Sequence, residues 1–136
     1  MESIIEGLRD YFAECPLLHG SCFVDWVPDT AGSYGIIPES DSGIKKFITG
    51  GGIREYIFNL QIRLMSEDKK SPENLKLMED IEQWCTLKDK EKNFPHMPAG
   101  CTPTKISAEK GALCERDKAG RTGLYKIRFR VNYIKI

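Results

Sequence analysis

The chain has 136 residues, a length that suits one domain with one sizeable core and leaves too few residues for two. Apolar residues make up 40% of the sequence and charged residues 29%, and 20 Lys and Arg balance 20 Asp and Glu. This balance excludes a global field that would draw the molecule to nucleic acid or to a membrane, so any charge-based role must be local. We expect a single domain over residues 1–136.

The N-terminal segment MESIIEGLRDYFAEC carries acidic residues where a secretory signal would carry positive charge. No apolar run approaches the ~20 residues that span a bilayer, so we expect a cytosolic protein without a membrane partner. The five cysteines include no Cys-x-x-Cys pair, a pattern typical of reduced thiols rather than of a disulfide framework.

The first elements are expected to be a helix and two short strands. Apolar residues recur at helical spacing over residues 2–14, and Pro16 follows, which predicts a short amphipathic helix. The segments SCFVDWV (21–27) and YGIIPE (34–39) have the aromatic and β-branched bias of strands, and turn residues separate them.

Three consecutive glycines, Gly50–Gly52, precede a long run of alternating side chains. A phosphate-binding glycine loop leads into a helix N-terminus, whose unpaired N–H groups hold the anion. Here the glycines lead into a pattern of period two, so we expect a turn or bulge where a long strand begins. One face of that strand is predicted to carry Tyr56, Phe58, Leu60, Ile62 and Leu64, and the other Ile57, Asn59, Gln61, Arg63 and Met65.

A second helix is expected from Ser71 to about residue 85, because Ser71 suits the N-cap and Pro72 the first helical position. The charged, proline-rich segment 88–103 has no period and is predicted to be an exposed loop. The helix should bury Leu75, Met78, Ile81, Trp84 and Cys85 and leave Lys76, Glu79, Asp80 and Glu82 to water.

The last 32 residues, 105–136, predict a short strand, a tight turn at 109–111, a second short strand, a turn at 117–120 and a final long strand. Two long strands with the same alternation suggest antiparallel neighbours in one sheet. One face of this sheet would be buried and the other exposed to solvent. The expected fold is α+β: a mostly antiparallel sheet with two long strands, packed against an N-terminal helix and one central helix.

Residues that could carry chemistry are sparse. Cys15, His19 and Cys22 lie close in the sequence, but a closed zinc site needs four ligands, and buried cysteines beside a surface histidine explain the group better. No flanking signature marks an activated cysteine, and the carboxylate pairs at 67–68 and 79–80 are expected to be solvated. We therefore expect no catalytic residue, no cofactor and no metal.

A row of basic residues, Lys126, Arg128 and Arg130, lies on the last strand, and Arg54 and Arg63 are candidates to join it from the neighbouring strand. Nucleic-acid readers often interleave such a row with exposed aromatic residues, whereas here the aromatic residues fall on the opposite face. A protein interface or a solvated face is favoured, and a small nucleic-acid-binding or adaptor module is the alternative.

From about Ile44 onward, over roughly two-thirds of the chain, the order of segments resembles a family of small prophage proteins of Gram-positive bacteria labelled minor capsid proteins. That family is similar to the tail-terminator and tail-completion proteins of long-tailed phages. The matching positions are Lys46-Phe47-Ile48-Thr49-Gly50, Tyr56-Ile57-Phe58, Asn74, Trp84, Asn93-Phe94-Pro95, Pro98, Gly100, Tyr125, Ile127, Phe129 and Arg130.

The resemblance implies an α+β subunit of a ring at the head-proximal end of the tail, without enzymatic activity. Its partners would be further copies of itself on the tail, the tail-tube protein and the head–tail connector protein, without sequence-specific nucleic acid. It would be found in the virion, and in the bacterial host cytoplasm during assembly. Segments 28–52 and 88–103 would supply much of the contact surface. The candidate interface residues are Tyr34, Ile36, Phe47, Arg54, Phe94, Arg128 and Arg130.

Overall fold

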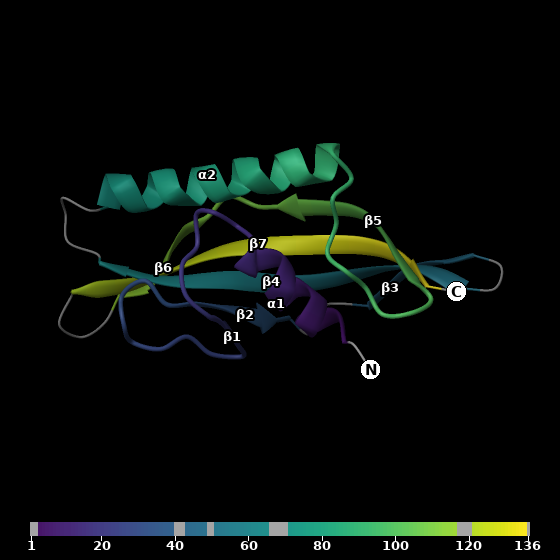
Figure 1. Cartoon of the computed structure of the whole chain (residues 1–136), viewed down its shortest axis with the longest axis horizontal. Coiled ribbons are helices and arrows are strands. Elements are labelled where there is room, and N and C mark those ends of the chain that lie inside the picture. The colour runs from purple at the N-terminus through teal and green to yellow at the C-terminus, as the bar shows by residue number, and fades with distance from the viewer. Residues whose placement is uncertain (1–2, 40–42, 49–50, 66–70, 117–120, 136) are drawn as a thin grey trace.

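The computed structural model describes residues 3–39, 43–48, 51–65, 71–116 and 121–135, and of residues 43–48, 51 and 71 it describes the backbone alone. Over these ranges the chain is α+β, as expected, with two helices and a mixed, mostly antiparallel sheet (Figure 1). The elements are α1 (Ile4–Ala13), β1 (Cys22–Val24), β2 (Tyr34–Pro38), β3 (Gly43–Ile48), β4 (Gly51–Met65), α2 (Ser71–Lys90), β5 (Cys101–Ala108), β6 (Ala112–Arg116) and β7 (Thr122–Lys135).

Strands β4 and β7 form the centre of the sheet and pair antiparallel from Gly52 opposite Lys135 to Met65 opposite Thr122. Each also pairs, on its outer edge, with two short strands laid end to end: β4 with β3 and β2, and β7 with β5 and β6. Strand β1 adds a parallel neighbour beyond β2, which makes the sheet mixed. The chain at 109–111 is therefore not a hairpin turn, because the described partner of both β5 and β6 is β7.

Helix α1 lies over one face of the sheet and α2 runs along its β5 side (Figure 1), and an aromatic cluster joins both helices to that face. The ring of Phe12 in α1 meets the rings of Phe58 and Phe129, with centroids 5.8 and 5.1 Å away. Phe58 and Phe129 are cross-strand neighbours whose rings stack at 5.3 Å. Trp84 of α2 completes the cluster at 5.2 Å from Tyr11 and 5.7 Å from Phe12. Apolar burial and ring packing thus connect both helices to both long strands.

Helix α2 differs from the prediction at both ends. Its buried stripe runs through Asn74, Met78, Ile81 and Cys85, so Leu75 lies one position off the stripe and is 44% exposed. Asn74 takes the inward position because its amide donates hydrogen bonds to the Met65 carbonyl at 2.6 Å and to the Tyr125 hydroxyl at 3.3 Å. The helix also continues to Lys90, beyond the predicted end near residue 85.

The connection after α2 is not the wholly exposed loop that its composition predicts. Pro95 and Met97 are buried, and a strand begins at Cys101, inside the segment expected to be loop. The connection covers α1: the Tyr11 hydroxyl donates a hydrogen bond to the Asn93 carbonyl at 2.8 Å. A methyl group at Gly7 would overlap the carbonyl oxygen of His96, so only glycine allows this approach.

The glycine run joins two antiparallel strands, since Ile48 of β3 pairs with Gly51 of β4. The element that begins at Gly51 is a strand, whereas a phosphate loop leads into a helix N-terminus. Residues 49–50, the turn expected at 117–120, the pair Glu67 and Asp68 and the Ser71 side chain lie outside the described residues. Neither helix, over the residues described, is long and apolar enough to cross a membrane.

Candidate protein interface

The sheet has a second face, opposite the helices, which we call the open face. Because side chains alternate along a strand, the residues between the core positions of β4 and β7 all point to it. Its central residues are Glu55, Ile57, Asn59, Gln61 and Arg63 of β4 and Lys126, Arg128, Arg130 and Asn132 of β7, joined by Glu39 and Glu109 from the flanking segments.

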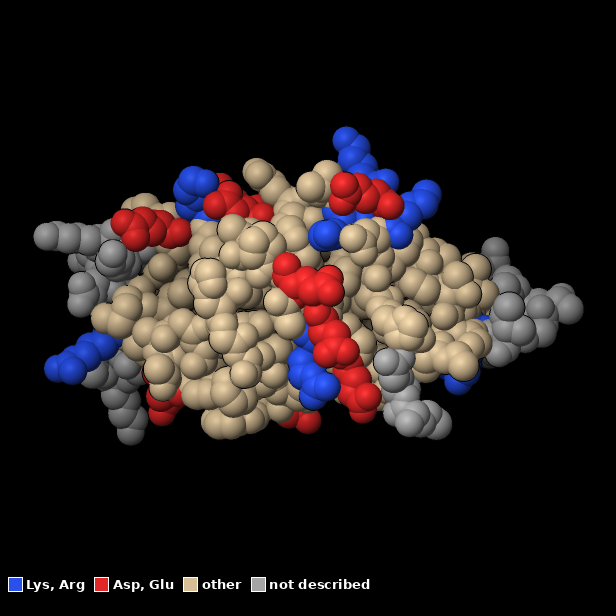
Figure 2. Space-filling model, viewed as in Figure 1, with Lys and Arg blue, Asp and Glu red and all other residues tan. Residues whose placement is uncertain are grey.

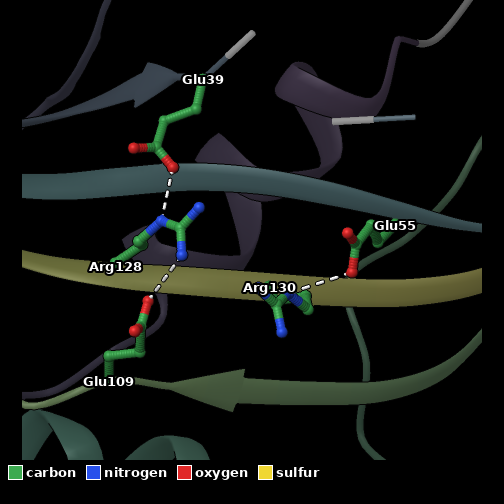
Figure 3. A network of polar contacts seen from close by, with 5 residues as sticks. All are labelled: Glu39, Glu55, Glu109, Arg128 and Arg130. Atoms are coloured by element: carbon green, nitrogen blue, oxygen red, sulfur yellow. Dashed lines mark hydrogen bonds and ion pairs between the residues drawn. The ribbon is translucent and has the colours of Figure 1, made fainter. Parts of the chain in front are cut away.

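Arg128 lies across the open face and bridges two carboxylates (Figure 3). Its Nε donates to Glu39 Oε2 at 2.6 Å, and its Nη1 donates to Glu109 Oε2 at 3.0 Å. Backbone hydrogen bonds position both acids: the Glu39 N–H donates to the Ile57 carbonyl, and the Glu109 N–H donates to the Arg128 carbonyl. One guanidinium therefore links the β2 side of the sheet to the β5 side, across β4 and β7.

These contacts shift the proton affinities of both partners. The hydrogen bond from Arg128 lowers the pKa of Glu39 most, burial opposes this effect, and a further hydrogen bond from Asn59 adds to the lowering. The hydrogen bonds to Glu39 and Glu109 raise the pKa of Arg128. The charged forms of the acid and the base are thus the stable ones near neutral pH.

A second ion pair joins Arg130 Nε to Glu55 Oε2 at 3.1 Å (Figure 3). Arg130 lies opposite Ile57 and Arg128 lies opposite Asn59, and the two β4 residues are only 2% and 6% exposed. The prediction of a plainly wet face is wrong at these positions, because long arginine side chains lie over the strand. The result is a surface of paired charges above buried β4 residues.

An exposed tryptophan borders the open face. Asp25 has φ 71°, which turns the chain after β1, and the segment 23–27 then folds over Gly35. Tyr34 and Ile36 point into the core, so a methyl group at Gly35 would point to the open face, where it would lie 2.5 Å from the Trp26 carbonyl oxygen. Trp26 is 57% exposed and its ring contacts Phe23 with centroids 5.1 Å apart. Tryptophan and arginine are the residues most enriched at binding hot spots.

Of the residues proposed from sequence for an interface, Arg128 and Arg130 come together on the open face. Tyr34 and Ile36 are corrected: they are 1% and 0% exposed in the core cluster, so their side chains are closed to a partner in this fold. The reason is the position of β2, which lies between β1 and β4 and packs against α1.

Three further candidates lie elsewhere. Arg54 is opposite Tyr133, a residue of the helix side, so it does not extend the row formed by Arg128 and Arg130, and that expectation is wrong. Phe94 is partly buried against the core beside α1. The backbone of Phe47 lies in β3, and its side chain is outside the described part.

Sequence reasoning missed Trp26 and the acidic partners Glu39, Glu55 and Glu109. A tryptophan in the turn-rich segment DWVPD was a usable signal, because a large aromatic residue seldom occupies a turn without a packing or binding role. The acids carried no local signal, since each is recognisable only once the sheet places it beside an arginine.

The thiols fit a structural role. Burial raises the pKa of Cys22 to about 11 and that of Cys85 to about 12, and burial also raises the pKa of Cys15. These three thiols are therefore protonated near neutral pH and poor nucleophiles. Among the described residues there is no group of three or more His, Cys, Asp or Glu side chains placed to hold a metal ion.

Comparison with models of protein families finds none that matches the chain, and comparison with curated proteins finds no match either.

Proposed function

We propose that this chain is a structural subunit of a phage or prophage virion, a tail terminator or a head–tail joining protein. It would form a ring with further copies, end the polymerisation of the tail tube and bind the head–tail connector. It would act without catalysis, through surfaces presented by a sheet of two long strands with helices packed on one side.

The observation that carries the proposal is the ordered resemblance from Ile44 to Arg130. The matching residues are spread through the fold rather than gathered at one pocket. Trp84 and Phe129 belong to the aromatic cluster, Phe94 packs where the connection covers α1, and Arg130 lies on the open face. The matching residues thus include both core positions and a surface position. This distribution supports an assembly role better than an enzymatic one.

The open face supports a protein partner over nucleic acid. To bind nucleic acid, a row of basic side chains on a strand must be available to neutralise phosphates and so release the counterions of the nucleic acid. Arg128 and Arg130 instead meet Glu39, Glu109 and Glu55, so the local charge is close to balanced. Mixed charge beside an exposed Trp26 is the composition of a protein interface with an aromatic anchor.

Electron microscopy of particles from a strain that lacks the gene tests the proposal. Overlong tubes without heads would establish tail termination. Tails of normal length lying apart from filled heads would place the chain at the joining step. Unchanged infectious particles would contradict both roles and would favour an adaptor module.

Complementation of that strain tests the open face separately. Trp26→Ala combined with Lys126→Glu changes two exposed side chains of this region, and we expect infectious particles to fall by at least about tenfold, as loss of a hot spot would cause. The matched control, Leu75→Ala with Lys76→Glu, changes an exposed leucine and an exposed lysine of α2 and should complement fully. Equal complementation by both variants would remove the open face from the proposal.

A further inference from the structure

A small groove lies between α1 and the connection that follows α2. It has a volume of about 180 Å³ and is lined by Gly7, Asp10, Tyr11, Glu14, Asn93, Phe94 and His96. The hydrogen bond from Tyr11 to the Asn93 carbonyl closes one end, and the close approach of Gly7 to His96 fixes the distance between the walls. The groove is therefore built by the same contacts that hold the connection on α1.

The size and chemistry of the groove define what fits it. Pockets for small molecules usually measure ~300–1,000 Å³, so this one suits a single long side chain instead. Two exposed acids, Asp10 and Glu14, line it together with two aromatic residues, Tyr11 and Phe94. Carboxylates next to aromatic rings attract an ammonium or guanidinium group. Arg9, which lies 3.8 Å from Asp10, offsets part of this negative charge but leaves Glu14.

The chain carries a lysine-bearing segment directly beside the groove. Lys88, Lys90 and Lys92 follow at alternate positions at the end of α2, and the next residue, Asn93, already lines the groove. Of the two acids between the lysines, Asp89 accepts the Ile106 N–H, and the exposed Glu91 offsets part of the positive charge. Lys88 stays on its own helix, with Nζ 5.6 Å from the centre of the Trp84 ring. Lys90 and Lys92 are exposed, and Lys92 has φ 55°, which turns the chain away from the helix. Figure 2 shows both regions on one surface: an acidic band over α1 with a basic side chain beside it, and basic side chains with acidic ones among them at the end of α2.

Adjoining patches of opposite charge on one surface are self-complementary. When two copies pair about a two-fold axis, each presents the same surface to the other. The lysines of the first copy can then meet the groove of the second, and the lysines of the second can meet the groove of the first. We propose that the groove binds the side chain of Lys90 or Lys92 from a second copy of this chain, in a reciprocal two-fold contact. This contact does not rest on the tail-assembly role, since closing a ring requires a different, heterologous surface.

Sedimentation equilibrium of the full chain tests the contact. At about 50 mM salt we expect the average mass to rise with concentration from 15.5 kDa toward twice that value, and about 0.5 M salt should reverse the rise by screening. Asp10→Lys with Glu14→Lys should remain at 15.5 kDa, because both copies then present basic groove and basic lysines. Lys90→Glu with Lys92→Glu should also remain at that mass, for the opposite reason.

An equimolar mixture of these two variants is the decisive sample. One variant is basic at both patches and the other acidic at both, so mixing restores two attractive contacts and should restore the doubled mass. Glu79→Lys with Glu115→Lys makes the same change in net charge at exposed positions away from the groove and should associate like the wild type. A wild type that stays monomeric at all concentrations, or a mixture that stays monomeric, would overturn the inference. Either result would leave the tail-assembly proposal intact, since that proposal is judged from particles.

Discussion

At the scale of single residues, Gly7 shows how one missing side chain permits a tertiary contact. A glycine inside a helix costs about 1 kcal/mol relative to alanine, so an alanine at an open position would stabilise α1. At Gly7 the added methyl would overlap the His96 carbonyl oxygen, and backbone cannot rotate aside. We expect Gly7→Ala to lower the free energy of unfolding by about 1–3 kcal/mol, measured by urea denaturation.

The control for this substitution lies on the same helix. Arg9→Ala changes an exposed residue two positions away and should alter the free energy of unfolding by no more than about 0.5 kcal/mol. A Gly7→Ala protein more stable than the wild type would show that the connection does not lie on α1 as described.

Glu39 leads to a prediction about pH. Its pKa in the fold lies below its usual value, chiefly through the hydrogen bond from Arg128. A group of this kind stabilises the fold above its unfolded pKa of about 4.3, and its contribution disappears as the pH falls through the lower folded pKa. Glu39→Gln should therefore be less stable than the wild type at neutral pH, and the difference should shrink on acidification.

Urea titrations at several pH values would measure this difference. Glu109→Gln removes the more exposed acid that Arg128 contacts, and its effect should be smaller because solvent screens that pair. A difference between wild type and Glu39→Gln that stays constant from neutral to acidic pH would refute the proposed role of the ion pair.

Burial of a residue could be predicted where the alternation of apolar and polar residues continues over a long strand. It could not be predicted in a short strand. Phe58 and Phe129 were placed in the core by a period of two sustained over many positions. Tyr34 and Ile36 lie in a strand of five residues, and its interior position depends on β1 and α1, which the local sequence does not reveal. Asn59 is buried on the polar side because arginine side chains from another strand cover it.

At the scale of elements, α2 uses acidic side chains to hold the chain of β5 and the residues after it. Asp89 Oδ1 accepts the N–H of Ile106 in β5 at 3.0 Å, and Glu82 Oε2 accepts the N–H of Gly111, between β5 and β6, at 3.0 Å. The edge N–H of Ile106 is therefore occupied and cannot pair with a foreign strand. We expect Asp89→Ala to lower the free energy of unfolding by about 1–3 kcal/mol, because a partly buried donor loses its charged acceptor.

Hydrogen exchange measured by NMR provides the local test. The amide of Ile106 should exchange faster in Asp89→Ala than in the wild type, whereas Glu79→Ala, on the exposed side of α2, should leave both stability and exchange unchanged. Unaltered protection of Ile106 in Asp89→Ala would mean that the helix does not guard this edge.

The kind of element was easier to predict than its neighbours. The sequence patterns indicated strands and helices near their observed places, but not that β5 and β6 lie end to end along β7. That arrangement depends on β7 being long enough for two partners. The end of α2 was also missed, because its last residues are charged and its helical state depends on packing rather than on an apolar stripe.

At the scale of the whole molecule, the aromatic cluster joins elements that are remote in sequence. Phe12 contacts β4 and β7 directly and α2 through Trp84. We expect Phe12→Ala to lower the free energy of unfolding by about 3–5 kcal/mol. We also expect the wild type to unfold in one step, because the cluster joins both helices to the two central strands.

Two probes test this cooperativity. In a Trp26→Phe background the remaining tryptophan, Trp84, reports on the cluster, and far-ultraviolet circular dichroism reports on the helices and the sheet. The two unfolding curves should coincide. Separate midpoints would show that α1 or α2 can detach while the sheet persists.

The candidate site was the least predictable part. Two of its arginines were found from their place on the last strand, but the network also needs Glu39 and Glu109, which lie 89 and 19 residues from Arg128 in sequence. Such a site forms only once the strands pair in one register, because a shift of β7 by one residue would turn Arg128 to the other face, away from both acids.

The pairing of β4 with β7 has a mechanical consequence. Their hydrogen bonds run across the sheet, perpendicular to the strand axes. A force that draws one strand lengthwise past the other therefore acts on all of these hydrogen bonds at once. A force that pulls the strands apart at one end breaks the hydrogen bonds one after another. A subunit placed in an assembly with its long strands parallel to the tension would resist stretching. The same subunit turned through a right angle would lose its hydrogen bonds in succession, so its strands would separate under a smaller force.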